Sequence, residues 1–220
     1  MKFIFLKRTV LAFFACTLLL LWGTVSYLTI SSRNETLLHA KTENENLADA
    51  LNAYSELVFN SIANRHNELA ERYPTETRFA PLDPKITQFL GGRARDTKGI
   101  RSLNIFSVDG FMIQSGIAPK NGEIYAPKRL INFRERPYFK YFADNWTPER
   151  KDELFIGAPV KSKVTGLWTV PIASPRSSSN DEFPGLVVSA MLIQNFMDFY
   201  TASELDQDLI LDISHLDGTM

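Results

Sequence analysis

The sequence predicts an α+β fold in which an N-terminal transmembrane helix and a long stalk helix precede an antiparallel sheet with flanking helices. Three observations predict it: an apolar run at residues 9–30, a segment at 31–73 with helical spacing, and short β-rich runs beyond residue 100. The 220 residues, 45% of them hydrophobic, suffice for one ordinary globular domain with additional segments.

The charge balance excludes one class of protein. Lys and Arg number 24 against 25 Asp and Glu, so the net charge is -1. Because no broad positive field exists to neutralise a phosphate backbone, a general nucleic-acid-binding protein is excluded. Cys16 is the only cysteine, so no internal disulfide can form.

The apolar run at residues 9–30 predicts a transmembrane helix, because about 20 apolar residues span the hydrocarbon core of a bilayer. Lys2, Lys7 and Arg8 precede it, and the positive-inside rule therefore predicts a cytoplasmic N-terminus at residues 1–8. A cleavable signal peptide is the alternative. It would have an apolar core of about 7–15 residues and a small-x-small cleavage site, and neither fits well here.

Residues 31–73 predict one long helix. No Gly or Pro interrupts the segment, and apolar side chains recur at steps of three, four or seven residues: Leu47, Leu51, Tyr54, Val58, Ile62 and Leu69. About 40 residues correspond to about 60 Å of helix. Two interpretations stay open: a simple stalk, or a stalk whose apolar stripe also forms a homodimer contact.

The predicted sheet begins after a loop rich in Pro, Gly and charge at residues 74–98, which contains one short helix at 85–90. Two short β-runs, 100–107 and 111–116, flank Asp109-Gly110 and predict a hairpin. The whole region from residue 74 to residue 203 is predicted to form one module.

Residues 134–171 form the central stretch of this module. They predict a short aromatic and basic helix, a polar loop, and two β-runs separated by a turn at Thr165-Gly166. The apolar, β-branched run at 185–193 predicts a buried strand, and residues 194–203 carry aromatic and Met side chains at helical spacing that indicate core packing.

The last ten residues repeat an earlier pattern. Residues 211–220 (LDISHLDGTM) match 103–112 (LNIFSVDGFM), with Leu, Ile, Asp, Gly and Met in register. The repeat predicts that residues 204–220 begin a second, truncated module of the same kind. The alternative is that any strand ending in Asp-Gly gives such a match.

Arg136, Tyr138 and Phe139 are the first candidate binding residues. A guanidinium offers a planar fork of donors that suits a carboxylate, and neighbouring rings can complete a small anion pocket. The alternative is a surface ion pair between Arg136 and either Glu135 or Asp144. Spacing alone slightly favours the ion pair.

The run VKSKV at residues 160–164 supplies further candidates. In a strand, Lys161 and Lys163 share one face and Ser162 lies on the other, so one of these faces points at whatever the sheet encloses. Trp168 follows the turn. It is either a ring that stacks on a ligand or a core aromatic, and the core interpretation is the safer one.

Catalytic and metal-binding motifs are absent from the sequence. His39 and His66 fall on the predicted stalk and His215 near the end of the sequence, so no metal-ligand spacing exists. Neither a phosphate-binding loop nor a Gly-x-Ser-x-Gly motif occurs. We therefore expect a non-enzymatic binding module without a cofactor.

The order of these parts resembles the extracytoplasmic Cache sensor domains of bacterial receptors, which are PAS-like folds preceding histidine kinases, diguanylate cyclases and chemoreceptors. The motifs that carry the resemblance are Asp109-Gly110, Arg136-x-Tyr138-Phe139, Gly157-x-Pro159-Val160, Thr165-Gly166-x-Trp168 and Gly185-Leu186-Val187-Val188. The resemblance covers residues 31–203, and 208–220 resemble the opening of the second module of a double-Cache unit.

The resemblance implies a ligand pocket in the membrane-distal module, residues 74–203, where Arg136 grips a ligand carboxylate and Tyr138 and Phe139 line the cavity. In relatives that bind amino acids, a strand carboxylate holds the ligand amine. Here the matching position is Ser162, between Lys161 and Lys163. This departure favours a small organic anion over an α-amino acid.

The expected function is therefore the periplasmic ligand-sensing region of a receptor in the bacterial inner membrane, with ligand occupancy relayed through the stalk helix. The alternative is a ligand-free dimerisation module that only positions the anchor helices. An exported hydrolase is a third class, but no pairing of nucleophile and base supports it.

Overall fold

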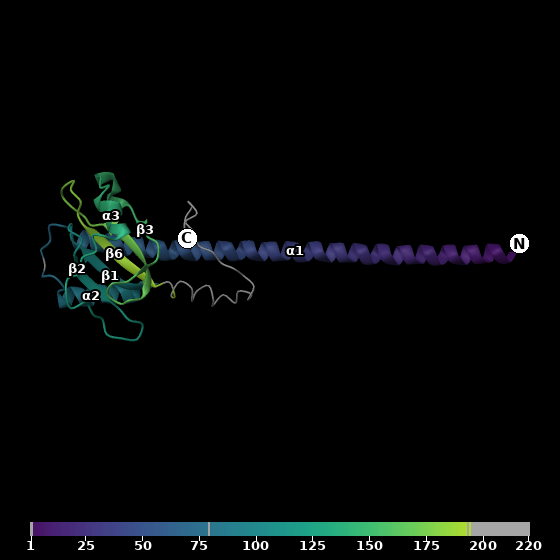
Figure 1. Cartoon of the computed structure of the whole chain (residues 1–220), viewed down its shortest axis with the longest axis horizontal. Coiled ribbons are helices and arrows are strands. Elements are labelled where there is room, and N and C mark those ends of the chain that lie inside the picture. The colour runs from purple at the N-terminus through teal and green to yellow at the C-terminus, as the bar shows by residue number, and fades with distance from the viewer. Residues whose placement is uncertain (1, 79, 193, 195–220) are drawn as a thin grey trace. The chain divides into compact units, whose positions relative to one another are not determined.

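The computed structural model describes residues 2–78, 80–192 and 194, and the side chains from Phe13 onward (Figure 1). The chain divides into two compact units, Met1–Tyr54 and Ser55–Met220. The elements are α1 (Lys2–Arg72), α2 (Pro84–Asp96), β1 (Ile100–Phe106), β2 (Met112–Ile117), α3 (Pro137–Ala143), the 3-10 helix η1 (Pro148–Asp152), β3 (Phe155–Ile156), β4 (Val160–Lys161), β5 (Trp168–Pro175) and β6 (Leu186–Leu192). The α+β fold class is confirmed.

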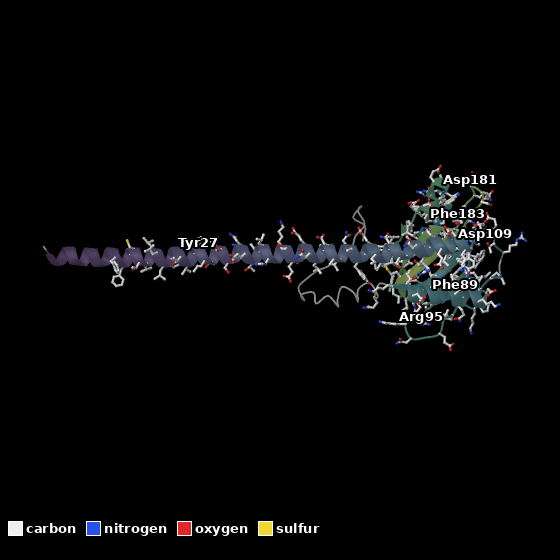
Figure 2. The ribbon with its side chains drawn as sticks, turned by 180° about the vertical axis from the view of Figure 1, so that it is seen from behind. Tyr27, Phe89, Arg95, Asp109, Asp181 and Phe183 are labelled. Carbon is white, nitrogen blue, oxygen red and sulfur yellow. The ribbon has the colours of Figure 1, made fainter. Side chains whose placement is uncertain are left out.

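The first unit consists of the N-terminal part of α1. From Phe13 onward this helix is long and apolar enough to cross a membrane, and the apolar window is not buried within the protein. Tyr27 projects from it with 72% of its surface exposed (Figure 2). Threonine hydroxyls in this segment donate to backbone carbonyls of the preceding turn, as Thr24 donates to the Leu20 carbonyl. Such a bond satisfies the hydroxyl inside the helix, which suits an apolar environment. The cytoplasmic N-terminus stays a prediction.

The second unit contains an antiparallel sheet in the order β2-β1-β6-β5-β3, with β4 also paired to β5. The predicted hairpin is confirmed as β1 and β2, with a register shift between Ile105 and Phe106. Gly110 has φ 83° in the turn, a backbone conformation that favours glycine. A Cβ there would also lie 2.9 Å from the Arg134 backbone, so the turn brings residue 134 to the sheet.

The two faces of the sheet are covered by different helices. Val58, Ile62 and Leu69 of α1 are buried, as the apolar stripe predicts, and α1 reaches β5 through His66 and Ser174. α3 packs on the opposite face, in an apolar cluster of Phe106, Met112, Phe133, Tyr138, Phe139, Phe142, Ala173, Leu186 and Val188. Homodimerisation through α1 stays a prediction.

The C-terminal end of α1 is held by the loop between β5 and β6. Arg176, 4% exposed, donates to the carbonyls of Tyr73 and Pro74 at 3.0 and 2.7 Å. A cation at this position satisfies terminal carbonyls and complements the helix dipole. Thr75 adds a bond from its N–H to Ser177, and Glu76 accepts from Ser179 at 2.7 Å.

These hydrogen bonds hold the pKa of Glu76 well below its usual range, at about 2. The carboxylate is therefore charged over the whole physiological range. The segment after α1 and the β5–β6 loop are joined by charge-assisted as well as neutral bonds.

Two predicted elements differ in length. The predicted short helix 85–90 is longer in the structure, because α2 continues through Gly91 to Asp96. Glycine fits at position 91 because a Cβ there would lie 2.1 Å from the Ile124 side chain. The predicted strand 160–164 stops at Lys161, because Ser162 begins a turn. The interpretations of 195–203 and 204–220 fall outside the described residues.

Replacing Gly116 with alanine should destabilise the second unit. A Cβ at Gly116 would lie 2.2 Å from the Gly91 nitrogen and 2.6 Å from Leu90, so α2 would have to move off β2. We expect a loss of about 1–3 kcal/mol in the free energy of unfolding, measured by urea denaturation of the chain in detergent.

Gly92→Ala is the matched control, because a Cβ there meets nothing within 4 Å. It should stabilise α2 by about 0.5–1 kcal/mol, since alanine restricts the unfolded backbone more than glycine does. Equal effects of the two substitutions would contradict the described contact between α2 and β2.

Candidate functional site

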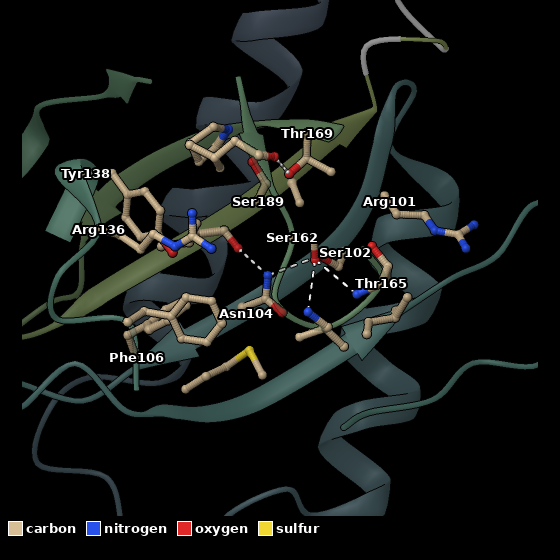
Figure 3. Close-up of a pocket in the computed structure, with 18 of the residues that line it drawn as sticks. Arg101, Ser102, Asn104, Phe106, Arg136, Tyr138, Ser162, Thr165, Thr169 and Ser189 are labelled. Carbon is tan, nitrogen blue, oxygen red and sulfur yellow. Dashed lines mark hydrogen bonds between the residues drawn. The ribbon is translucent and has the colours of Figure 1, made fainter. Parts of the chain in front are cut away.

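A cavity of about 50 Å³ lies between the α3-side face of the sheet and residues 160–165, which we call the strap (Figure 3). It lies beside the N-terminus of α3. Its lining residues are Arg101, Ser102, Asn104, Phe106, Met112, Ile117, Phe133, Arg136, Tyr138, Val160, Lys161, Ser162, Val164, Thr165, Thr169, Pro171, Val188, Ser189 and Ala190.

The floor of the cavity is a buried polar row on β1. Ser102 and Asn104 alternate with apolar residues, so both side chains face the cavity. The Asn104 amide donates to Ser102 Oγ and to the Val188 carbonyl, both at 3.1 Å, and its oxygen accepts from Ser115 Oγ at 2.7 Å. The amide is thereby held in one orientation, which fixes the geometry of the floor.

Arg136 is placed by the start of α3. It is the N-cap residue with an extended backbone, and Pro137 begins the first turn. Its side chain is 19% exposed; one guanidinium NH2 group donates to the Lys161 carbonyl at 3.0 Å, and Nε lies 3.8 Å from Glu135. A guanidinium carries five N–H donors, so donors remain for a ligand in the cavity.

The two aromatic candidates on α3, Tyr138 and Phe139, differ in whether they line the cavity. Tyr138 lines the cavity and is 5% exposed, and its ring packs edge-on against Phe106 with centroids 6.3 Å apart. Burial raises the pKa of Tyr138 well above its usual range, so the phenol stays protonated. Phe139 is fully buried against Phe183 and does not line the cavity.

The strap closes the cavity from the solvent side. Ser162 Oγ accepts from the backbone N–H groups of Val164 and Thr165, both at 3.2 Å, and thereby shapes the turn. Its hydroxyl oxygen is engaged as an acceptor while the O–H stays able to donate. Lys161 contributes its carbonyl to the hydrogen bond from Arg136.

Lys163 turns away from the cavity. Its ammonium donates to the Asn132 carbonyl at 2.9 Å, pairs with Glu135, and lies 5.1 Å from the centroid of the Phe133 ring. The hydrogen bond from Lys163 lowers the pKa of the Glu135 carboxyl. The predicted ion pair between Glu135 and Arg136 is thus present, but Glu135 binds Lys163 more closely.

The position of Trp168 differs from the expected one in the core. It is 60% exposed and is not among the residues that line the cavity, so the interpretation as a core aromatic is wrong. The register explains this, because Trp168 begins β5 opposite Lys161, at the end of the sheet. The structure therefore brings Arg136, Tyr138, Lys161 and Ser162 together at the cavity and leaves Phe139, Lys163 and Trp168 outside it.

The sequence did not indicate three polar residues that line the cavity: Ser102, Asn104 and Thr169. The signal was available for β1, because polar side chains at alternate positions of an otherwise apolar, buried strand must share a face and find partners there. Thr169 carried no such signal. Its place in the cavity depends on the pairing of β5 with β4, which brings its hydroxyl 3.4 Å from the Val160 carbonyl.

The charges of the lining residues have one sign. Among the described residues, the lining includes the basic residues Arg101, Arg136 and Lys161 and no Asp or Glu. In the described part of the chain, no group of three or more His, Cys, Asp or Glu residues is placed to hold a metal ion. The cavity therefore offers hydrogen-bond donors and positive charge, which suit an anionic ligand.

The chain shares its architecture with a solved extracellular domain. It superimposes on that of rpHK1S-Z16, a protein described as a histidine kinase, with a TM-score of 0.60 and 19% identity over 74% of this chain and 62% of that one. The chain therefore has the fold of that extracellular domain, as expected for the predicted fold.

Two further structures match with lower scores. An extracellular ligand-binding receptor from Desulfohalobium retbaense gives a TM-score of 0.49 and 14% identity over 68% of this chain and 25% of that one. The ligand-binding domain of the Pseudomonas fluorescens chemoreceptor CtaA, in complex with L-isoleucine, gives 0.44 and 16% over 70% and 55%. The chain spans less than two thirds of each of the three. No protein-family model and no curated protein matches it.

Replacing Asn104 with alanine should destabilise the fold, because the Val188 carbonyl, Ser102 and Ser115 would each lose a partner in a buried place. We expect a loss of about 2–3 kcal/mol in the free energy of unfolding by urea denaturation. The exposed Asn121→Ala should change it by less than about 0.5 kcal/mol. A loss at Asn104 as small as that at Asn121 would contradict the described floor.

Proposed function

We propose that this chain is the ligand-sensing region of a bacterial membrane receptor, placed outside the cytoplasm, and that its cavity binds a small carboxylate without an amino group. The observation that carries the proposal is the lining of the cavity: Arg136 faces a floor of hydroxyls and amide, and no lining residue is a carboxylate. A carboxylate ligand would gain charge-assisted hydrogen bonds there, whereas an ammonium would find no anionic partner.

The serine hydroxyls that line the cavity also favour a ligand that accepts hydrogen bonds. Ser162 Oγ already accepts two backbone N–H groups, and Ser102 Oγ accepts the Asn104 amide. Because their acceptor capacity is partly used, each hydroxyl has its O–H to offer. A ligand with acceptor oxygens complements these donors better than one that must donate.

The size of the cavity limits the ligand. Ordinary ligand sites enclose about 300–1,000 Å³, and this cavity has about 50 Å³. The ligand is therefore a carboxylate of a few heavy atoms, or the strap moves outward when a larger one binds. The same small volume is the observation that favours the alternative function, a ligand-free module that positions the anchor helices.

The relay would run through the sheet to α1. Thr169 and Pro171 of β5 line the cavity, while Ser174 of the same strand meets His66 of α1 at 2.8 Å on the other face. A shift of β5 on ligand binding would therefore displace its contact with α1. Such a relay requires the ligand to bind more tightly to one of two arrangements of the helix on the sheet.

Arg136→Ala should abolish the response to small carboxylates. The probes are formate, acetate, glycolate, lactate and propionate, added in a thermal-shift screen of the chain in detergent, with hits measured by calorimetry. Loss of the partly buried, charge-assisted partner should weaken binding by about 2 kcal/mol or more, which is about 30-fold. Arg134→Ala is the matched control, since it removes the same charge from an exposed side chain two residues away.

The screen separates the two proposed functions. A hit that Arg136→Ala and the wild type bind equally would show that the guanidinium does not hold the ligand. If no probe raises the unfolding temperature of the wild type at concentrations far above physiological levels, the ligand-free module becomes the better account.

His66 should make the stability of the second unit depend on pH. Burial lowers the pKa of His66 from 6.5 to about 3, so the folded chain keeps the imidazole neutral while the unfolded chain protonates it below pH 6.5. The free energy of unfolding should therefore fall as the pH drops from 6.5 toward 3, by about 1.4 kcal/mol per pH unit from this group. Above pH 6.5 the group contributes no pH dependence.

Urea denaturation at pH 7, 6 and 5 measures this slope. His66→Gln should flatten the dependence relative to the wild type, whereas His39→Gln, which removes an exposed histidine from the first unit, should leave it unchanged. An unaltered slope in His66→Gln would mean that His66 is not held neutral between α1 and β5.

A further inference from the structure

A carboxylate of the protein itself lies beside the cation that the proposed ligand needs. Glu135 precedes Arg136 in the chain, and its Oε1 is 3.8 Å from Arg136 Nε. Because a carboxylate that pairs with this guanidinium competes with a ligand carboxylate, Glu135 is a competitor that is always present. Binding at Arg136 therefore depends on where the Glu135 carboxylate is held.

Lys163 of the strap holds this carboxylate. Its ammonium lies 2.5 Å from Glu135 Oε1, much closer than the 3.8 Å that separates Arg136 Nε from the same oxygen. The hydrogen bond from Lys163 is also the largest cause of the lowered pKa of the Glu135 carboxyl, ahead of the charge of Arg136. Lys163 is therefore the main partner of Glu135, and Arg136 is the second.

The Lys163 ammonium is fixed in this place by contacts that do not involve Glu135. It donates to the Asn132 carbonyl at 2.9 Å, and it lies 5.1 Å from the centroid of the Phe133 ring, whose face attracts a cation. Phe133 is itself buried in the apolar cluster on the α3 side of the sheet. The fold thus presents the ammonium to Glu135 from a fixed position.

Arg136 and Glu135 differ in how far they are buried. The Arg136 side chain is 19% exposed and the Glu135 side chain 56%, and only the arginine lines the cavity. The guanidinium lies next to the Tyr138 ring (Figure 3) and gives one of its five N–H donors to the Lys161 carbonyl. With Glu135 drawn to Lys163, the other donors stay available to a ligand.

We propose that Lys163 is a positioning residue, which holds the Glu135 carboxylate and thereby keeps the Arg136 guanidinium free for a ligand carboxylate. The inference rests on the proposed function, in which Arg136 binds the ligand. Without the lysine, Glu135 turns to its remaining cation and occupies donors that the ligand needs. Lys163 thus supports binding without touching the ligand, since it does not line the cavity.

Lys163→Met tests this role, because it removes the charge and keeps an unbranched side chain. Propionate binding, measured by isothermal titration calorimetry on the chain in detergent, should weaken about five-fold, which is the upper end of the scale for a partly exposed ion pair. Glu135→Gln in the same background should restore the affinity, because a neutral amide competes poorly for a guanidinium. Glu135→Gln alone should leave binding as tight as in the wild type or tighter.

Two charge-matched controls separate this role from a general effect of charge. Lys140→Met removes a cation from an exposed side chain of α3, one turn after Arg136, and should leave propionate binding unchanged. Asp144→Asn, added to Lys163→Met, removes an exposed carboxylate at the end of α3 and should not restore the affinity. Unchanged binding in Lys163→Met, no rescue by Glu135→Gln, or equal effects of a variant and its control would each overturn the proposal.

A titration without ligand distinguishes this inference from the proposed function. NMR of the full chain, labelled with ¹³C at the glutamate carboxyls, follows the pKa of Glu135, whose signal is the one lost in Glu135→Gln. In Lys163→Met this pKa should stay below its ordinary value, because Arg136 becomes the partner, and adding Arg136→Ala should return it to that value.

The outcomes of the titration and the calorimetry are independent. If the wild type binds no small carboxylate while the Glu135 pKa behaves as expected, the proposed function is wrong, and the role of Lys163 in keeping the guanidinium free is confirmed. If Lys163→Met alone returns the Glu135 pKa to its ordinary value, the carboxylate does not turn to Arg136. That result overturns the inference even where propionate binds.

Discussion

The hydrogen bond from Arg136 to the Lys161 carbonyl is the contact on which the candidate site depends. At 3.0 Å it joins the start of α3 to the strap, two segments 25 residues apart, and so closes the cavity over the polar floor of β1. It also holds a long, flexible cation in one place, so a carboxylate would not have to order the side chain on binding. The rest of the site is arranged around this fixed charge.

The sheet lies between the cavity and α1. Its α3-side face carries the cavity floor, and its other face carries α1, where His66 is fully buried against Ser174. Arg176 and Glu76 then tie the end of α1 to the β5–β6 loop. These contacts hold α1 to β5 and to the loop after that strand, and the proposed relay would act through them.

The sequence predicted the parts of the fold that local patterns encode. The α1 stripe, the β1–β2 hairpin at Gly110 and the placement of Arg136 before α3 follow from periodicity, turn chemistry and proline position. Trp168 was misjudged because its exposure depends on where β5 begins relative to β6, a matter of long-range register. Ser162 likewise left the predicted strand because its hydroxyl bonds the backbone of the turn, an interaction that competes with strand pairing.

The most direct test of the central claim, that the cavity selects a carboxylate without an amino group, compares propionate with L-alanine by isothermal titration calorimetry. The two ligands share a skeleton and differ in one ammonium. With no carboxylate among the lining residues, propionate should bind and L-alanine should bind at least about 30-fold more weakly, the equivalent of about 2 kcal/mol for an unpaired buried charge. Binding of L-alanine as tight as or tighter than that of propionate would contradict the account.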